Sequence, residues 1–290
     1  MKINYIQHTD IDKERYDRCI LNARQGTIYA MSWYLDTVAP GWQLLATTGY
    51  SFIMPVPQKK KFGIPYVIQP ILCQQLGVFS AEEITKEVYD CFVKKIPGVY
   101  CVLQLNNGNV FDQKELRPNY VLDIRPDYET IRSRYHSNTR NDLKKIAKSG
   151  LIADNQTEAV EVIELVKEHS PHYTGKLLTM ARKLVKKACE KDIVRVRCVR
   201  DESTSELLAG ALFFQWKNRL YYLLPISTPD GKKVRAMRFL IDRFIAELAG
   251  QDYIIDFEGS AILSVAQFYR NFGAISEPYP RYYKNKWLHP

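Results

Sequence analysis

The chain has 290 residues, of which 46% are hydrophobic and 25% are charged, a balance that excludes a disordered protein. Its formal net charge of +9 favours an anionic partner, such as a nucleotide, a phosphorylated substrate, an acidic lipid or a nucleic acid. There is no run of about 18 apolar residues and no apolar segment after Lys2, so the sequence predicts neither a membrane span nor a signal peptide.

The cysteines and histidines argue against disulfides and metal sites. None of the six cysteines forms a CxxC pair, and most lie inside apolar runs, so we interpret them as reduced core cysteines of a cytoplasmic protein. His169 and His172 are three residues apart, but Pro171 breaks the helix that would direct both at one ion. We therefore expect no metal. The chain also has neither a P-loop nor a strand-linked GxGxxG motif.

Residues 1–120 predict a first domain of mixed strands and helices. Short apolar or alternating runs predict strands at residues 2–7, 42–47, 50–56 and 99–105. Apolar residues at helical spacing predict helices at residues 11–23 and 82–95. An aromatic segment, TIYAMSWYL, lies between the first helix and the second strand.

Residues 121–290 predict a second domain of similar character. A strand at residues 117–124 leads into it, and a strongly basic pair of helices follows at residues 128–148. The next predicted elements are a brief strand at residues 151–153, helices at 157–169 and 174–189, and a strand at 193–199. A strand at residues 279–288 closes the chain.

One stretch of the second domain has the order of a ligand site. Two apolar strands, Leu208–Trp216 and Arg219–Pro225, are followed by a polar loop and a basic helix start, Lys232–Arg238. A strand, Tyr253–Phe257, and a helix ending at Phe268–Ala274 come next. This order places a helix N-terminus after one strand and an acidic strand end beside it, which suits a phosphate-bearing ligand between the two strands.

Several of these segments resemble the FemAB-like acyltransferases, two-domain members of the GNAT (N-acetyltransferase) superfamily. Residues 137–151 (SNTRNDLKKIAKSGL) resemble a basic segment of that family, and residues 52–77 resemble a stretch of its first domain. Residues 210–226, 253–259 and 268–274 resemble its central hairpin, acidic strand end and helix end. The resemblance implies an α/β (α+β) fold with mixed sheets and two tandem GNAT-like domains. It also implies that the acyl donor binds in the C-terminal domain.

Two departures from the family pattern bear on the donor. The glycine-rich GNAT pyrophosphate motif is absent, because residues 230–236 read DGKKVRA. Tyr269 stands where FemAB-like proteins usually have Lys and where simple GNAT enzymes have Tyr. The resemblance implies acetyl-CoA or another acyl-CoA as donor, with aminoacyl-tRNA as the alternative.

Acyl transfer to an amine needs a neutral amine, a donor for the oxyanion and a proton for the leaving thiolate. We predict Glu258 as general base, because it lies at the strand exit and would share a face with Asp256 in a regular strand. The alternative for Glu258 is an ion pair or a helix cap. We predict Tyr269 as the acid, since an ordinary pKa of about 10 keeps a phenol protonated. Its alternative is core packing.

The resemblance also assigns donor contacts. Leu224 and Ile226 would offer backbone groups around Pro225, which has no N–H and should interrupt strand pairing. Lys232, Lys233 and Arg235 crowd the predicted helix start, where cations oppose the helix dipole unless an anion binds on the same turn. The alternatives are an ordinary strand end and a solvated basic face.

The acceptor site is predicted from two further groups of residues. Tyr29 and Trp33, with Gln74, would line an acceptor cleft, although aromatic residues in such a run are often core. Arg140 belongs to the densest positive patch, which would hold the phosphates of a nucleotide-linked acceptor or of RNA. The alternative for this patch is a solvated helix face.

These observations predict an acyltransferase that moves an acyl group, in the simplest case acetyl from acetyl-CoA, directly to an amine on a small or nucleotide-sugar-linked acceptor. One alternative is FemAB-type transfer from aminoacyl-tRNA to a cell-wall precursor, although residues 174–190 are too short for the long helical hairpin of some such enzymes. The other alternative is a non-catalytic GNAT-fold binding protein that has lost the donor site.

Overall fold

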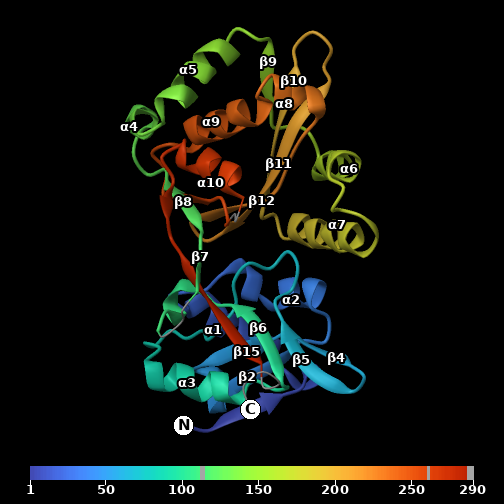
Figure 1. The fold of residues 1–290 in the computed structure, drawn as a ribbon, viewed down its shortest axis with the longest axis vertical. Coiled ribbons are helices and arrows are strands. Elements are labelled where there is room, and N and C mark those ends of the chain that lie inside the picture. The colour runs from blue at the N-terminus through green and yellow to red at the C-terminus, as the bar shows by residue number, and fades with distance from the viewer. Residues whose placement is uncertain (112–114, 260–261, 286–290) are drawn as a thin grey trace. The chain divides into compact units, whose positions relative to one another are not determined.

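The computed structural model describes residues 1–111, 115–259 and 262–285 and divides into two compact units (Figure 1). The first unit comprises residues 1–118 together with the C-terminal residues from 278, and the second comprises residues 119–277. The C-terminal strand β15 (Tyr279–Asn285) pairs antiparallel with β6 (Tyr100–Gln104) of the first unit. The chain therefore returns to its first unit, whereas the sequence had assigned residues 121–290 to one domain. Residues 286–288 of the predicted last strand lie outside the described residues.

The first unit contains two sheets. A three-stranded antiparallel sheet has the order β1 (Ile3–Ile6), β2 (Gln43–Thr47) and β3 (Ile53–Val56). A five-stranded sheet has the order β4 (Gln58–Lys61), β5 (Ile64–Ile68), β6, β15 and β7 (Leu116–Arg117). The helices are α1 (Lys13–Asn22), α2 (Ser32–Val38) and α3 (Lys86–Lys95). Tyr89, Phe92 and Val93 of α3 have helical spacing and are buried in the core of this unit.

The second unit is built on one seven-stranded sheet. Its order is β14 (Ile275–Ser276), β8 (Tyr120–Asp123), β13 (Ile254–Asp256), β12 (Arg219–Ser227), β11 (Leu207–Trp216), β10 (Val194–Asp201) and β9 (Leu151–Asp154). β12 and β13 are parallel, and the other pairs are antiparallel. The mixed α/β fold class predicted from the sequence is confirmed.

Helices cover both faces of this sheet (Figure 1). One face carries α4 (Tyr128–Ser133), α5 (Ser137–Ile146), α9 (Ala236–Leu248) and α10 (Leu263–Arg270), and the other carries α6 (Ala159–His169) and α7 (Gly175–Glu190). A short helix, α8 (Pro229–Lys233), precedes α9. Because both faces are covered, β11 is almost continuously apolar and buried.

Close packing against β11 depends on two small residues. A Cβ atom on Gly210 would lie 3.0 Å from a methyl carbon of Val162 on α6. A Cβ atom on Gly231 of α8 would lie 2.0 Å from the carbonyl oxygen of Leu208. These glycines let α6 and α8 approach the strand directly, which fixes the loop that follows β12.

Candidate active site

The candidate site begins where two parallel strands separate. β12 and β13 pair at three positions, from Arg219 opposite Ile254 to Tyr221 opposite Asp256. β13 then ends, whereas β12 continues to Ser227 and remains paired with β11. Within the described ranges, the edge of β12 that faces away from β11 therefore has no strand partner beyond Tyr221. We call this edge the slot, because it leaves backbone N–H and C=O groups available to an extended ligand.

A β-bulge lies on the slot. Leu212 is opposite Leu224 and Phe213 is opposite Tyr222, so Leu223 is the extra residue on β12. The extra residue of a bulge is left out of the hydrogen-bond ladder. Leu223 therefore offers backbone groups next to Leu224, which the sequence had predicted as a donor contact. The sequence had not marked Leu223 itself.

Alternation along β12 determines which backbone groups face the slot. The N–H of Thr228 donates to the carbonyl of Leu208 at 3.0 Å, so this pair is of the hydrogen-bonded type. Because the two pair types alternate, the backbone groups of Ile226 face β11, and those of Pro225 and Ser227 face the slot. Pro225 has no N–H to pair with a further strand. The predicted contact of Ile226 would then come from its side chain, which is buried.

Glu258 lies where the chain leaves β13. Its backbone φ is 59°, in the left-handed region, and its N–H donates to Oδ1 of Asp256 at 2.9 Å. The strand is therefore not regular at this point, and the shared face predicted for Asp256 and Glu258 does not apply. A non-glycine residue in this conformation at a strand end is uncommon and is found more often at functional sites.

Asp256 forms a buried ion pair and is therefore not available as a general base. Its side chain is 1% exposed, and its Oδ2 lies 2.7 Å from Nη1 of Arg219. The same guanidinium binds Glu277 through two hydrogen bonds of 2.7 and 3.0 Å. Burial raises the pKa of Asp256, and Arg219 opposes that shift. The cluster ties β13 to β12 and to the segment after β14.

Tyr269 of α10 is packed among aromatic rings. It is 7% exposed and stacks on Phe257 at 4.8 Å between ring centroids, with Tyr222 against it edge-on at 6.3 Å. Burial, and then the charges of Glu258 and Asp256, raise the pKa of Tyr269 above its ordinary value. The phenol thus remains protonated at neutral pH, as an acid or hydrogen-bond donor requires. The core packing named as an alternative is present as well.

Tyr173 is a residue that the sequence analysis missed. It lies in the connection between α6 and α7 and is half-buried. Burial, and then the charge of Glu258, raise the pKa of Tyr173 to about 12. The charge of Glu258 thus contributes to the raised pKa of both Tyr173 and Tyr269. A single tyrosine in a polar connection gave no signal in the sequence.

The predicted basic helix start is different in the structure. Thr228 caps α8 and Pro229 opens it, so Lys232 and Lys233 lie in its last turn. Cations are favourable at that end of a helix, so their placement does not require an anion. Lys233 pairs with Asp230 of the same helix at 2.6 Å.

Arg235 separates α8 from α9. It has a left-handed φ of 59° and precedes the first residue of α9, Ala236. Its Nη1 lies 2.9 Å from Oδ1 of Asp142 on α5, and Arg238 pairs with the same carboxylate. Arg235 therefore already has an acidic partner in the protein.

The predicted acceptor residues Tyr29, Trp33 and Gln74 all belong to the first unit. Tyr29 is 1% exposed, and its ring and that of Trp33 contact Tyr34 at 5.6 and 5.4 Å between centroids. The side-chain carbonyl of Gln74 accepts a hydrogen bond from Gln75 at 2.8 Å. Glu258 and Tyr269 belong to the second unit, so the acceptor role of these residues remains a prediction.

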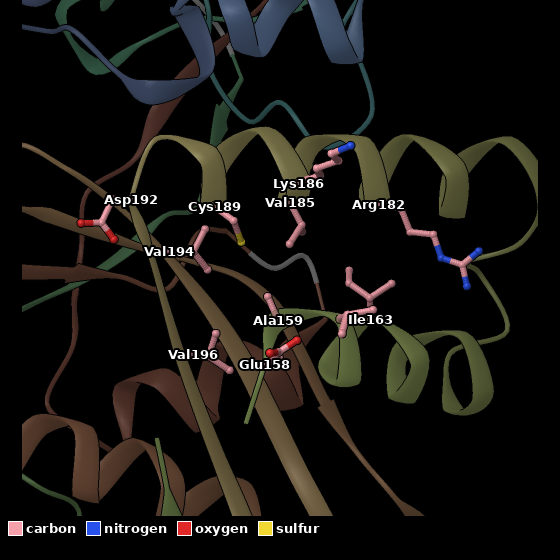
Figure 2. Close-up of a pocket in the computed structure, with 11 residues that line it drawn as sticks. Glu158, Ala159, Ile163, Arg182, Val185, Lys186, Cys189, Asp192, Val194 and Val196 are labelled. Atoms are coloured by element: carbon pink, nitrogen blue, oxygen red, sulfur yellow. The ribbon is translucent and has the colours of Figure 1, made fainter. Parts of the chain in front are cut away.

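A separate cavity of the second unit lies away from the slot. It has a volume of about 640 Å³ and lies between α6, α7 and β10, with Ile163, Val185, Val194 and Val196 among its lining (Figure 2). Its thiol, Cys189, has a pKa raised by burial and then by Glu190, which makes it a poor nucleophile. The pocket shares no lining residue with the slot.

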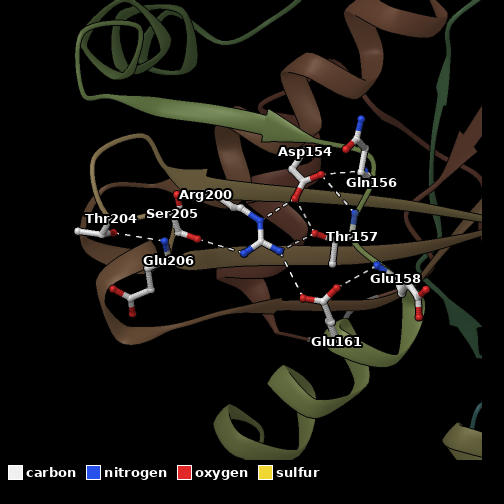
Figure 3. Close-up of polar contacts among 9 residues, drawn as sticks. All are labelled: Asp154, Gln156, Thr157, Glu158, Glu161, Arg200, Thr204, Ser205 and Glu206. Atoms are coloured by element: carbon white, nitrogen blue, oxygen red, sulfur yellow. Dashed lines mark hydrogen bonds and ion pairs between the residues drawn. The ribbon is translucent and has the colours of Figure 1, made fainter.

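A closed polar cluster around Arg200 fixes the start of α6 on β10 (Figure 3). The guanidinium donates to Asp154 at 2.7 Å, to the hydroxyl of Thr157 at 2.9 Å and to Glu161 at 3.3 Å. Its third nitrogen donates to the carbonyl of Ser205 at 3.1 Å. Burial raises the pKa of Asp154, but the hydrogen bonds from Thr157 and Arg200 outweigh burial and lower that pKa to about 2.

Among the described side chains, no three His, Cys, Asp or Glu residues are grouped as metal ligands. None of the helices in residues 1–111, 115–259 and 262–285 combines the length and apolar character that a membrane crossing requires.

The fold was compared with known proteins. No family model matches the chain, and no curated protein matches it. The solved structure of FemX aligns over 100% of this chain and 99% of its own, with a TM-score of 0.64 and 10% identity. A tandem GNAT protein from the clavulanic acid biosynthesis pathway aligns over 97% and 98%, with a TM-score of 0.55 and 10% identity. L-PGS from Bacillus licheniformis aligns over 96% and 93%, with a TM-score of 0.52 and 10% identity.

These identities are low, so the likeness concerns the fold. It extends over nearly the whole length of each chain. The predicted resemblance to FemAB-like and tandem GNAT proteins is confirmed at that level. Fold similarity alone does not assign a reaction, which must be argued from the site.

Proposed function

We propose that the chain is an N-acyltransferase that transfers an acyl group to an amine, with the donor bound in the slot of the second unit. The observation that supports this most strongly is the separation of the parallel strands β12 and β13 beyond Tyr221 and Asp256. The same unit holds a bulge on the open edge and a buried tyrosine, Tyr269, whose pKa is raised by burial and then by the charge of Glu258. Together they supply the groups that direct acyl transfer requires.

In the proposed reaction, the amine nitrogen attacks the carbonyl carbon of a thioester. The new C–N bond forms, the C–S bond breaks, and the thiolate leaves. Glu258 takes a proton from the amine, directly or through water. The backbone N–H of Leu223 stabilises the oxyanion, and the phenol of Tyr269 donates to the leaving sulfur. Because the pKa of Tyr269 is raised, we assign it a hydrogen bond that stabilises the thiolate, with the final proton coming from solvent.

The proposed donor is acetyl-CoA or another acyl-CoA. The amide groups of its pantetheine arm would pair with backbone groups of Pro225 and Ser227 in the slot, as a strand would. Leu224 and Ile226 would contact the arm with side chains, and Lys232, Lys233 and Arg235 would lie at its phosphate end. We place the reaction in the cytoplasm, since all six cysteines are free. The acceptor would be a small or nucleotide-sugar-linked amine. The acceptor roles of Tyr29, Trp33 and Gln74 in the first unit and of Arg140 in the second stay separate predictions from the sequence.

The first test is thermal unfolding with acetyl-CoA, CoA and a short acyl-CoA series. A ligand at about 100 times its Kd adds roughly 2.7 kcal/mol of stability to the form that binds it. Unchanged unfolding with every CoA species would contradict an acyl-CoA slot.

The second test is mutational and applies once a donor is known. Glu258→Gln should lower kcat by roughly a hundredfold or more, since general bases contribute about that much. Tyr269→Phe should lower kcat less and leave the donor Kd unchanged. Lys167→Gln is the control, because Lys167 on α6 is exposed, pairs with Glu164 and has no role in the proposed site. Full activity in both site variants would rule out the roles assigned here.

An aminoacyl-tRNA donor is the second candidate, and the basic helices α4 and α5 favour it. If the donor is aminoacyl-tRNA, its binding to the chain should weaken steeply as the salt concentration rises, because each neutralised phosphate releases counterions. Stabilisation by RNA without stabilisation by any CoA would select this candidate. Failure of both donors, in a folded protein, would support the non-catalytic alternative.

A further inference from the structure

A second polar cavity lies between α4 and α5, outside the slot. It has a volume of about 290 Å³ and is lined by Glu129, Arg132, Ser133, Arg140, Asn141 and Lys144. Three of these side chains are cations and one is a carboxylate, which leaves an excess of two positive charges. The basic helix pair seen in the sequence therefore contributes a concave site and not only a solvated face.

Arg140 is held in place without being neutralised. Its Nη1 donates to the backbone carbonyl of Tyr135 and, at 3.3 Å, to that of Ser133. Both acceptors are uncharged, so the guanidinium keeps its full charge. A guanidinium fixed in this way loses less side-chain entropy when a ligand binds.

Arg132 has a donor that the protein does not use. Its Nε is shielded from solvent and has no hydrogen-bond partner. Nη1 lies 4.0 Å from Glu129, the limit for an ion pair, and the guanidinium stands 5.9 Å from the ring of Tyr128. The nearby carboxylate of Asp242 accepts from the hydroxyl of Tyr128 at 2.8 Å. The side chain as a whole is 33% exposed and lines the cavity, so its terminal nitrogens, rather than the shielded Nε, are open to an acceptor of a ligand.

Lys144 is the third cation that lines the cavity. It lies one helical turn after Arg140 on α5, and we find no carboxylate paired with it in the described part of the chain. Its neighbour Lys145 is equally exposed but does not line the cavity. The two lysines differ in position and not in chemistry, which gives a matched control.

We infer that this cavity binds a terminal phosphate or pyrophosphate of a nucleotide-type ligand. A phosphate monoester carries about −1.5 to −2 charges at neutral pH, which matches the excess of two cations. A carboxylate or a single RNA phosphodiester carries only one. The two guanidinium groups donate to phosphate oxygens, and Lys144 adds a compact charge. The inference uses no residue of the slot. It shares Arg140 with the acceptor role proposed above, and in that respect it rests on the proposed function and names its ligand chemistry.

The test is calorimetric titration of the full chain with inorganic pyrophosphate and, separately, with a nucleoside diphosphate. We expect saturable binding to the wild type. Lys144→Gln should weaken it about tenfold, and Arg132→Gln at least as much, since a hydrogen bond to a charged group contributes about 1.5–3 kcal/mol. Lys145→Gln should change it less than twofold. Unchanged thermal midpoints would confirm that the variants fold.

Three results would overturn the inference. Equal weakening by Lys144→Gln and Lys145→Gln would show a diffuse positive surface and no site. Binding of an RNA oligonucleotide with a steep salt dependence, without binding of either small ligand, would show a polyelectrolyte surface. Absence of any binding would remove the site altogether. Thermal stabilisation by acyl-CoA should persist in Lys144→Gln. If it persists while pyrophosphate does not bind the wild type, this inference fails and the proposed acyl-CoA slot stands.

Discussion

Arg200 and Arg132 are both arginines at the surface of the second unit, but their surroundings differ. Every nitrogen of Arg200 donates to an acceptor of the protein, and two of those acceptors are carboxylates (Figure 3). Arg132 has one carboxylate at 4.0 Å and a shielded Nε without an acceptor. We call the Arg200 cluster closed, because all its donors have acceptors within the protein, and the Arg132 cluster open, because one of its donors has none.

The difference separates two uses of the same residue type. In the closed cluster, the charge of Arg200 is paired with carboxylates of the protein, and these pairs join β10 to the start of α6. In the open cluster, charge and donors remain for something that the chain itself does not supply. The Arg219 cluster with Asp256 and Glu277 is closed as well, and it is more deeply buried. Stability measurements can therefore test the comparison directly.

The largest effect should come from the buried closed cluster. Arg219→Leu would leave Asp256 charged, 1% exposed and without its ion-pair partner. Removing one partner of a buried pair costs about 3–5 kcal/mol of the free energy of unfolding. Urea unfolding would measure the loss. The double variant Arg219→Leu with Asp256→Asn should recover part of it, and no recovery would mean that the charge of Asp256 is not the cause.

The second largest loss of stability should come from the Arg200 cluster, which is less buried than the Arg219 cluster. Arg200→Gln removes four hydrogen bonds, two of them to carboxylates, and we expect a loss of about 2–3 kcal/mol in the free energy of unfolding. Arg182→Gln is the matched control, because its ion pair with Glu164 is largely exposed and should contribute less than about 1 kcal/mol. Equal losses in the two variants would erase the distinction between closed and exposed pairs.

Acid should weaken the same cluster over a defined range. The pKa of Asp154 is about 2 in the folded chain, below its ordinary value of about 3.9. A depressed folded-state pKa means that the stabilisation is complete above pH 4 and is lost as the pH falls through 2. At about 1.36 kcal/mol per pKa unit, this shift corresponds to a contribution of about 2.6 kcal/mol at most. The pH dependence of unfolding between pH 4 and 2 should be shallower in Asp154→Asn than in the wild type.

The smallest effect on stability should come from the open cluster. Lys144→Gln removes a charge that has no carboxylate partner, so the free energy of unfolding should change by less than about 0.5 kcal/mol. Relief of repulsion from Arg140 and loss of a cation in the last turn of α5 act in opposite directions, so the net change should be close to zero. A loss above 1 kcal/mol would show that Lys144 supports the fold. In that case, its effect on anion binding could not be separated from folding.

Much of the second unit's layout was predictable from the sequence. The apolar runs at 208–216 and 219–225 became β11 and β12, because a central strand covered on both faces needs a continuous apolar pattern. The amphipathic spacing of residues 174–189 predicted α7 to within a residue at each end. Local patterns of this kind carry their own signal.

Features that depend on distant contacts were not predictable. The start of α8 depends on Thr228 and Pro229, and its effect on Lys232 becomes visible only once the helix bounds are known. The left-handed turn at Glu258 and the bulge at Leu223 arise from how strands meet. The effect of Glu258 on the pKa of Tyr173 depends on the fold, since the two residues are far apart in the sequence. The sequence therefore identified residue types at the site better than their geometry.

The return of β15 to the first unit has a consequence for how the chain is made. On a ribosome, all residues of the second unit emerge before the first unit receives its last strand. Until then, β6 has an unpaired edge on that side, and such edges invite pairing with other chains. The second unit is continuous in sequence and can complete its sheet without this strand. The unit that begins first is thus the one that finishes last during synthesis.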